Sequence, residues 1–150
     1  MQGVSGSGKS TKAEEIMNDY NHAVLVSADL YFMQEGGYKF DPSKLGEAHQ
    51  SCLRNFLDLI TGAGLDHSES GPDLVIVDNT NTQLWEMAPY IQTAAAYGHE
   101  IEVIRCVCPV EKAAGRNLHG VPEEAVQGMA SRLEKPLPFW PCTFREVVTG

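Results

Sequence analysis

Residues 3–10 read Gly-Val-Ser-Gly-Ser-Gly-Lys-Ser, a glycine-rich loop that ends in a lysine and a hydroxyl. Glycines let the backbone curl so that successive N–H groups point inward and bind phosphate oxygens. In a phosphate-binding loop (P-loop) of this spacing, the lysine reaches the β- and γ-phosphates and the serine hydroxyl binds Mg²⁺. We expect these roles for Lys9 and Ser10. The residues predicted to bind the nucleotide are Gly3, Val4, Ser5, Gly6, Ser7, Gly8, Lys9, Ser10 and Thr11.

A first acidic residue, Asp29, lies just past the apolar run Ala23–Ser27, which is typical of a buried strand. A carboxylate at the end of such a strand faces the γ-phosphate edge, where it can accept the proton of an incoming hydroxyl. An aspartate at this place can also form a turn or cap a short helix. The residue type and its spacing leave both interpretations open.

A second polar group, Asp78-Asn79-Thr80-Asn81, directly follows the apolar run Leu74–Val77. An acidic residue here can hold Mg²⁺ directly or through water, so we predict Asp78 as a metal ligand together with Ser10. The amides of Asn79 and Asn81 can orient an acceptor by hydrogen bonds. The same cluster can also cap the next helix, and the two interpretations are compatible.

A basic residue, Arg116, opens the run Arg-Asn-Leu-His-Gly-Val-Pro, which joins two predicted helices at 110–118 and 122–133. An arginine on a helical lid, here approximately residues 110–134, can close over a triphosphate and stabilise the transferring charge. On this interpretation Arg116 contacts the nucleotide and is catalytic. The alternative is a solvated helix face that ends in a Gly-Val-Pro turn.

These groups need a scaffold, and the pattern predicts alternating strands and helices. Apolar runs at 23–27, 74–77, 101–107 and 144–148 predict strands, and segments of helical spacing lie between them. Strands that are apolar without alternation predict a parallel sheet covered on both faces, which is a three-layer α/β fold. Because ligands bind at the carboxyl ends of such strands, the P-loop, Asp29 and Asp78 should meet at one edge.

The start of the chain differs from that pattern. An apolar strand typically runs directly into the glycine loop, but only Met1 and Gln2 precede Gly3. We therefore expect the first strand to be truncated, and we expect low stability for the chain as it stands. Its length of 150 residues fits a single domain over residues 1–150.

The composition favours a soluble protein that does not coat nucleic acid. The net charge of −9 argues against nonspecific binding to nucleic acid, although one strand end can still fit a locally basic cleft. No apolar run is long enough to span a bilayer, so we predict a cytoplasmic protein with no membrane partner. The four cysteines lack metal-site spacing and are expected to be free thiols.

Taken in order, these motifs resemble the polynucleotide 5′-kinase group of P-loop kinases, and within it the kinase domain of the Nedd-four-binding-protein-two-like proteins. The resemblance covers nearly the whole chain. It includes the P-loop, the run Ser27–Phe32, Ala48-His49, Val77–Asn81, and Arg116-Asn117-x-His119-Gly120-Val121-Pro122. The Asn-Thr-Asn and His-Gly-Val-Pro runs are far more specific than the P-loop.

The resemblance implies ATP-dependent phosphoryl transfer to the 5′-hydroxyl of DNA or RNA, with Mg²⁺ as a cofactor. It implies that Asp29 is the general base, that Arg116 is a lid arginine, and that Asp78 or Asn79 lies near the acceptor. Phe32 and His119 stand where the phage-type enzyme carries arginines. A kinase of a small metabolite hydroxyl therefore stays open, as does a nucleotide-binding module that transfers nothing.

Overall fold

The computed structural model describes residues 1–63, 70–118 and 120–150, so His119 of the predicted lid lies outside the described residues. The helices are α1 (Lys9–Met17), α2 (Leu45–Thr61), α3 (Leu84–Ala96), α4 (Val110–Arg116) and α5 (Glu123–Ser131), with 3-10 turns η1 (Ala28–Phe32) and η2 (Pro42–Lys44). The strands are β1 (Ala23–Val26), β2 (Met33–Gln34), β3 (Gly37–Tyr38), β4 (Leu74–Val77), β5 (Glu102–Val107) and β6 (Thr143–Val148).

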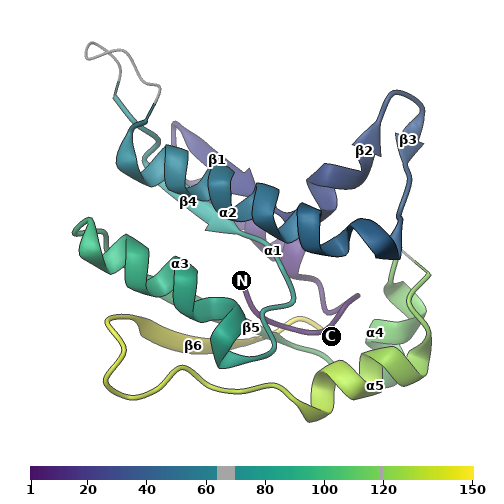
Figure 1. The fold of residues 1–150 in the computed structure, drawn as a ribbon. Coiled ribbons are helices and arrows are strands. Elements are labelled where there is room, and N and C mark those ends of the chain that lie inside the picture. Colours follow the sequence, from purple (N-terminus) through teal and green to yellow (C-terminus); the bar gives the residue numbers. More distant parts are fainter. Residues whose placement is uncertain (64–69, 119) are drawn as a thin grey trace.

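The four long strands pair in parallel, which confirms the predicted α/β class. β1 pairs with β4 and β5 pairs with β6, each in register along its length. Helices α2 and α3 lie in front of the strands and α1 lies behind them (Figure 1), so the strands have helices on both faces. A small antiparallel hairpin, β2–β3, follows η1 and projects away from the strands (Figure 1), in a part of the chain for which the sequence analysis predicted no strand.

Residues 1–3 lie between the two strand pairs. The Gln2 N–H donates to the Ile104 carbonyl at 2.9 Å, and the Cys106 N–H donates to the Gln2 carbonyl at 2.8 Å. The Gly3 N–H donates to the Thr80 carbonyl at 3.0 Å on the other side. These bonds carry the chain into the P-loop, but they form a single bridge and no strand. Beside them, a groove of about 960 Å³ opens along the edges of β4 and β5.

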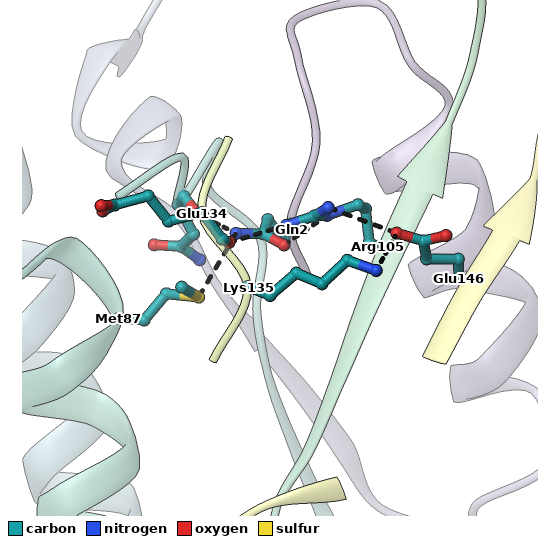
Figure 2. A network of polar contacts seen from close by, with 7 residues as sticks. Gln2, Met87, Arg105, Glu134, Lys135 and Glu146 are labelled. Atoms are coloured by element: carbon teal, nitrogen blue, oxygen red, sulfur yellow. Dashed lines mark hydrogen bonds and ion pairs between the residues drawn. The ribbon is translucent and has the colours of Figure 1, made fainter. Parts of the chain in front are cut away.

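A buried arginine fixes the start of the P-loop in this position. Arg105, only 8% exposed, donates from Nε to the Gln2 side-chain oxygen at 2.7 Å and from a terminal nitrogen to the Glu134 carbonyl at 2.7 Å. It also pairs with Glu146 at 3.2 Å, as Figure 2 shows. The Gln2 amide donates in turn to the Asn81 and Glu134 carbonyls. A buried charge is tolerated only when it is paired in this way, and here the pairing ties β5, β6 and the segment after α5 to the P-loop.

The largest apolar cluster lies between α2, η1 and the β1–β4 pair. Its buried members include Val26, Phe32, Cys52 and Phe56, with the apolar face of α2 supplying the cysteine and Phe56. The Asp41 side chain accepts from the Ser43 N–H and so caps η2, the 3-10 turn that leads into α2. This packing fixes η1, and with it Asp29, against the ends of the strands. Within the described residues, no helix is long and apolar enough to cross a bilayer.

Candidate active site

A cavity of about 620 Å³ lies at the carboxyl ends of the strands, where the sequence placed the site. Ten of the predicted site residues line it: Ser5, Gly6, Gly8, Lys9, Ser10, Thr11, Asp29, Asp78, Asn79 and Arg116. The other predicted residues, Gly3, Val4, Ser7 and Asn81, do not line it. Segments that are far apart in the sequence therefore meet around one cavity.

The P-loop packs directly against helix α4. Gly6 has a φ of +76°, a left-handed conformation that favours glycine, and a Cβ built on it would lie 2.0 Å from the Ala113 carbonyl oxygen. The Val4 side chain is buried with Ala113 and Val126 in a cluster that joins the loop to α4 and α5. The Val4 side chain thus serves packing, and a nucleotide contact from this residue would have to come from its backbone.

The Lys9 ammonium is held inside the P-loop. It donates to the Val4 carbonyl at 2.8 Å, and the residue is 9% exposed. Burial lowers the pKa of Lys9, while the negative charges of Asp78 and Asp29 act in the opposite direction. A triphosphate would supply more negative charge at this position, so it would favour the protonated ammonium.

Ser10 and Asp78 form a pair of oxygen donors. The Ser10 hydroxyl donates to Asp78 Oδ2 at 2.6 Å, which joins the first turn of α1 to the end of β4. The other carboxylate oxygen, Oδ1, is buried and has no hydrogen-bond partner among the described residues. A hydroxyl and a carboxylate are the hard oxygen ligands that Mg²⁺ takes, together with phosphate oxygens and water. This donor set therefore fits the predicted ion, and it would hold the ion with few protein ligands.

Asp29 belongs to η1, at the corner after β1. Its N–H donates to the Ser27 hydroxyl at 3.1 Å, so Ser27 and not Asp29 caps η1. The Asp29 carboxylate is therefore not used as the cap of this turn. The Tyr38 hydroxyl donates to Asp29 Oδ1 at 3.1 Å. The carboxylate lines the cavity beside Lys9 and Asp78, and its charge acts on the Lys9 ammonium.

The two asparagines make contacts within the protein. Asn79 accepts from the Ala28 N–H at 2.9 Å and donates to the Cys52 sulfur at 3.4 Å, so it links the ends of β4 and β1 to α2. Asn81, at a φ of +46°, donates to the Met1 carbonyl at 2.8 Å. Both side chains are at least 92% buried, since 8% of Asn79 and 7% of Asn81 is exposed. Their predicted contact with an acceptor stays a prediction.

Arg116 lies at the end of α4 and donates to the Thr149 carbonyl at 3.0 Å. The Thr149 hydroxyl donates to the Ser7 carbonyl in the P-loop, and its N–H donates to the Val107 carbonyl at 3.0 Å. Val147, Val148 and Thr149 therefore form one wall of the cavity, which the sequence analysis missed. The available signal was the strand predicted at 144–148, because its carboxyl end must reach the same edge.

A glycine loop that enters a helix and faces the ends of parallel strands defines a P-loop NTPase fold of the kinase type. The family model described as "AAA domain" matches residues 1–136, and the chain belongs to this family. The chain is also 32% identical over 141 residues to human NEDD4-binding protein 2, which confirms the resemblance inferred from the motifs. The match covers 90% of this chain and 7% of that protein.

Solved structures share the fold. Kti12 from Chaetomium thermophilum, in a complex with ADP-AlF3, matches with a TM-score of 0.61 at 18% identity, over 97% of this chain and 86% of that one. An unliganded sugar kinase from Janibacter matches at 0.59 with 20% identity, over 97% and 82% of the two chains. A gluconokinase from Sinorhizobium meliloti matches at 0.58 with 16% identity, over 97% and 79%.

Proposed function

We propose that the chain is an ATP-dependent kinase that transfers the γ-phosphoryl group to the 5′-hydroxyl of a polynucleotide. The observation that carries the kinase assignment is the cavity itself. The P-loop ammonium of Lys9, the Ser10–Asp78 oxygen pair and the carboxylate of Asp29 all face one volume of about 620 Å³. A nucleotide held by the loop would place its γ-phosphate between Lys9 and Asp29, with the acceptor approaching on the Asp29 side.

In the proposed reaction, the acceptor oxygen forms a bond to the γ-phosphorus while the bond from phosphorus to the β–γ bridging oxygen breaks and ADP leaves. The hydroxyl proton passes to the Asp29 carboxylate, and Lys9 stabilises the charge on the transferring group. Arg116 exchanges its contact with the Thr149 carbonyl for the phosphates when the nucleotide binds, with α4 and α5 acting as the lid.

Ser10 and Asp78 are the proposed ligands of Mg²⁺, which when bound neutralises charge on the β- and γ-phosphates. The buried Asp78 Oδ1 supports this role, because a buried oxygen without a partner is unfavourable unless a ligand satisfies it. The hydrogen bond from the Ser10 hydroxyl already holds the other carboxylate oxygen in place.

The choice of a polynucleotide acceptor rests on the motif resemblance and on the 32% identity to the human relative. A kinase of a sugar or another small hydroxyl compound is a second candidate. Two observations favour it: the net charge of −9, and the burial of Phe32 at the place where the phage-type enzyme carries an arginine. A nucleotide-binding module without transfer is the third.

A screen of acceptors with γ-labelled ATP separates the three. We expect kcat/KM to rise from a nucleoside to a nucleoside 3′-phosphate to an oligonucleotide, and to fall with salt for the oligonucleotide with a shallow slope of about one to three phosphates. Equal values for the three acceptors, or labelling of sugars alone, would reject the polynucleotide acceptor. Nucleotide binding with no labelled product from any acceptor would favour the module.

A further inference from the structure

A tyrosine that the proposed mechanism leaves without a role contacts the proposed base. The Tyr38 hydroxyl donates to Asp29 Oδ1 at 3.1 Å, across nine residues of sequence. Tyr38 belongs to the β2–β3 hairpin, a structure that the sequence did not predict and that the proposed mechanism has not used. The hairpin follows η1 directly in the chain, so Asp29 and the hairpin that contacts it belong to one continuous segment.

The hairpin is built to hold this hydroxyl in place. Met33 pairs with Tyr38, and the glycines at the turn, Gly36 and Gly37, have φ values of +112° and +107°. The Lys39 N–H donates to the Phe32 carbonyl at 2.9 Å, which closes the hairpin onto η1.

Aromatic packing anchors the same pair of segments. Phe32 is 2% exposed and belongs to the largest apolar cluster, three residues after Asp29. Its ring packs edge-on against Tyr38, with centroids 6.1 Å apart, and against Phe40 at 5.1 Å. A rigid aromatic contact on one side and a hydrogen bond on the other leave the Tyr38 ring little freedom.

The hydroxyl stays a hydrogen-bond donor at neutral pH. Burial, with the charge and hydrogen bond of Asp29 as further causes, raises the pKa of Tyr38 to about 12. A neutral donor next to a carboxylate fixes the plane of that carboxylate without bringing a charge that would compete with Lys9 for the phosphates.

From this geometry we infer that Tyr38 is a positioning residue for phosphoryl transfer: its hydroxyl holds the Asp29 carboxylate in the orientation that receives the acceptor proton. The inference rests on the proposed function only for the role of Asp29, and it holds for a nucleic-acid end and for a small hydroxyl compound alike. Loss of the hydroxyl leaves the base present but removes the hydrogen bond that orients it from the hairpin, and a base displaced by a fraction of an ångström accepts the proton less efficiently.

The test compares Tyr38→Phe with a matched control, Tyr31→Phe. The Tyr31 ring also packs edge-on against Phe32, and its hydroxyl donates to a carboxylate at 2.7 Å, but that carboxylate is Glu47. Both variants keep the ring and lose one hydroxyl. We expect Tyr38→Phe to lower kcat roughly tenfold to a hundredfold at an unchanged KM for ATP, and we expect Tyr31→Phe to stay within about twofold of the parent.

A double-mutant cycle shows whether the effect passes through Asp29. In an Asp29→Asn background, Tyr38→Phe should cost less than about twofold, because the base that it positions is gone. An equal loss in both backgrounds, or a loss shared by the Tyr31→Phe control, would overturn the inference, as would parent-like kcat in Tyr38→Phe. If the parent chain transfers phosphate to no acceptor, the proposed function falls and the inference falls with it. Transfer by the parent therefore separates the two failures.

Discussion

The contact between the P-loop and α4 can be tested with one added methyl group, Gly6→Ala. At Gly6 the new Cβ would lie 2.0 Å from the Ala113 carbonyl oxygen and 2.9 Å from the carbonyl carbon, and 3.0 Å from the Asn117 nitrogen. All three atoms are backbone atoms of α4 or the residue after it, so no side-chain rotation relieves the overlap. Either the loop or the helix must move by about an ångström, because carbon–oxygen contacts below roughly 3 Å are strongly repulsive.

Backbone strain must be separated from this overlap, and Gly98→Ala provides the matched control. Gly98 has a φ of +79°, close to the +76° of Gly6, and a Cβ there meets nothing within 4 Å. A left-handed alanine costs about 1–2 kcal/mol. Overpacking adds about 1–3 kcal/mol at Gly6 alone, for a total of roughly 2–5 kcal/mol.

Thermal melting measures the loss of stability in each variant, and nucleotide binding measures whether the P-loop keeps its shape. At about 2–4 °C per kcal/mol for a chain of this size, Gly98→Ala should lower Tm by roughly 2–8 °C and Gly6→Ala by roughly 4–20 °C. Gly98→Ala should bind ATP as the parent does, because it lies at the far end of α3. Gly6→Ala should lose binding, because the loop N–H groups no longer converge. Equal melting and equal affinity for the two variants would refute the P-loop–α4 contact.

Four further outcomes follow from the site and the sheet. Lys9→Ala should lower transfer by about 10²–10³-fold, measured against Lys44→Ala as a charge control; parent-like transfer would place catalysis elsewhere. Ser10→Ala should raise the Mg²⁺ concentration needed for half-maximal rate, and an unchanged titration would remove the hydroxyl from the metal site. Asp29→Asn should lower kcat by about 10²–10⁴-fold at nearly constant ATP affinity, and a loss of affinity instead would contradict a role on the acceptor. The last test fuses four or five β-branched residues before Met1, where they can occupy the groove between β4 and β5. This extension should raise Tm by several degrees, at about 2–4 °C per kcal/mol, whereas a Gly-Ser extension of equal length should not. Equal Tm values for the two extensions would argue against strand addition in the groove.

The long buried strands could be predicted from the sequence because their signal is local. The apolar run Leu74–Val77 is the strand β4 without any change of boundary, and Ala23–Val26 differs from its prediction by one residue. Once the strands are parallel, the fold rule alone places Asp29 and Asp78 at one edge, and both line the cavity. The site was predictable to the extent that strand order and strand ends determine it.

The hairpin and the use of the asparagines could not be predicted, because long-range packing determines them. The β2–β3 strands have two residues each, too few to show alternation, and their position depends on the contact of Phe32 with the core. Asn79 has the residue type of a substrate ligand, but its amide donates to the sulfur of Cys52, a residue 27 positions away in the sequence. No pattern in one sequence reveals such a pairing.

The buried polar residues predicted for the site divide into two sets, and the division supports the proposed function. Asn79 and Asn81 have carbonyl or amide contacts within the protein, so they stabilise the fold by bringing the strand ends together. Asp78 keeps a buried oxygen without a partner among the described residues, and Lys9 is a buried ammonium with a lowered pKa. A buried oxygen without a partner is unfavourable by about 1–3 kcal/mol, and burial also disfavours the charged form of Lys9. A triphosphate with its cation would bring negative charge to Lys9 and a positive charge to Asp78, and would thus relieve both. Lys9 and Asp78, the two buried groups that a nucleotide and its cation would stabilise, are therefore groups that the proposed kinase uses, whereas Asn79 and Asn81 belong to the framework that holds the strand ends together.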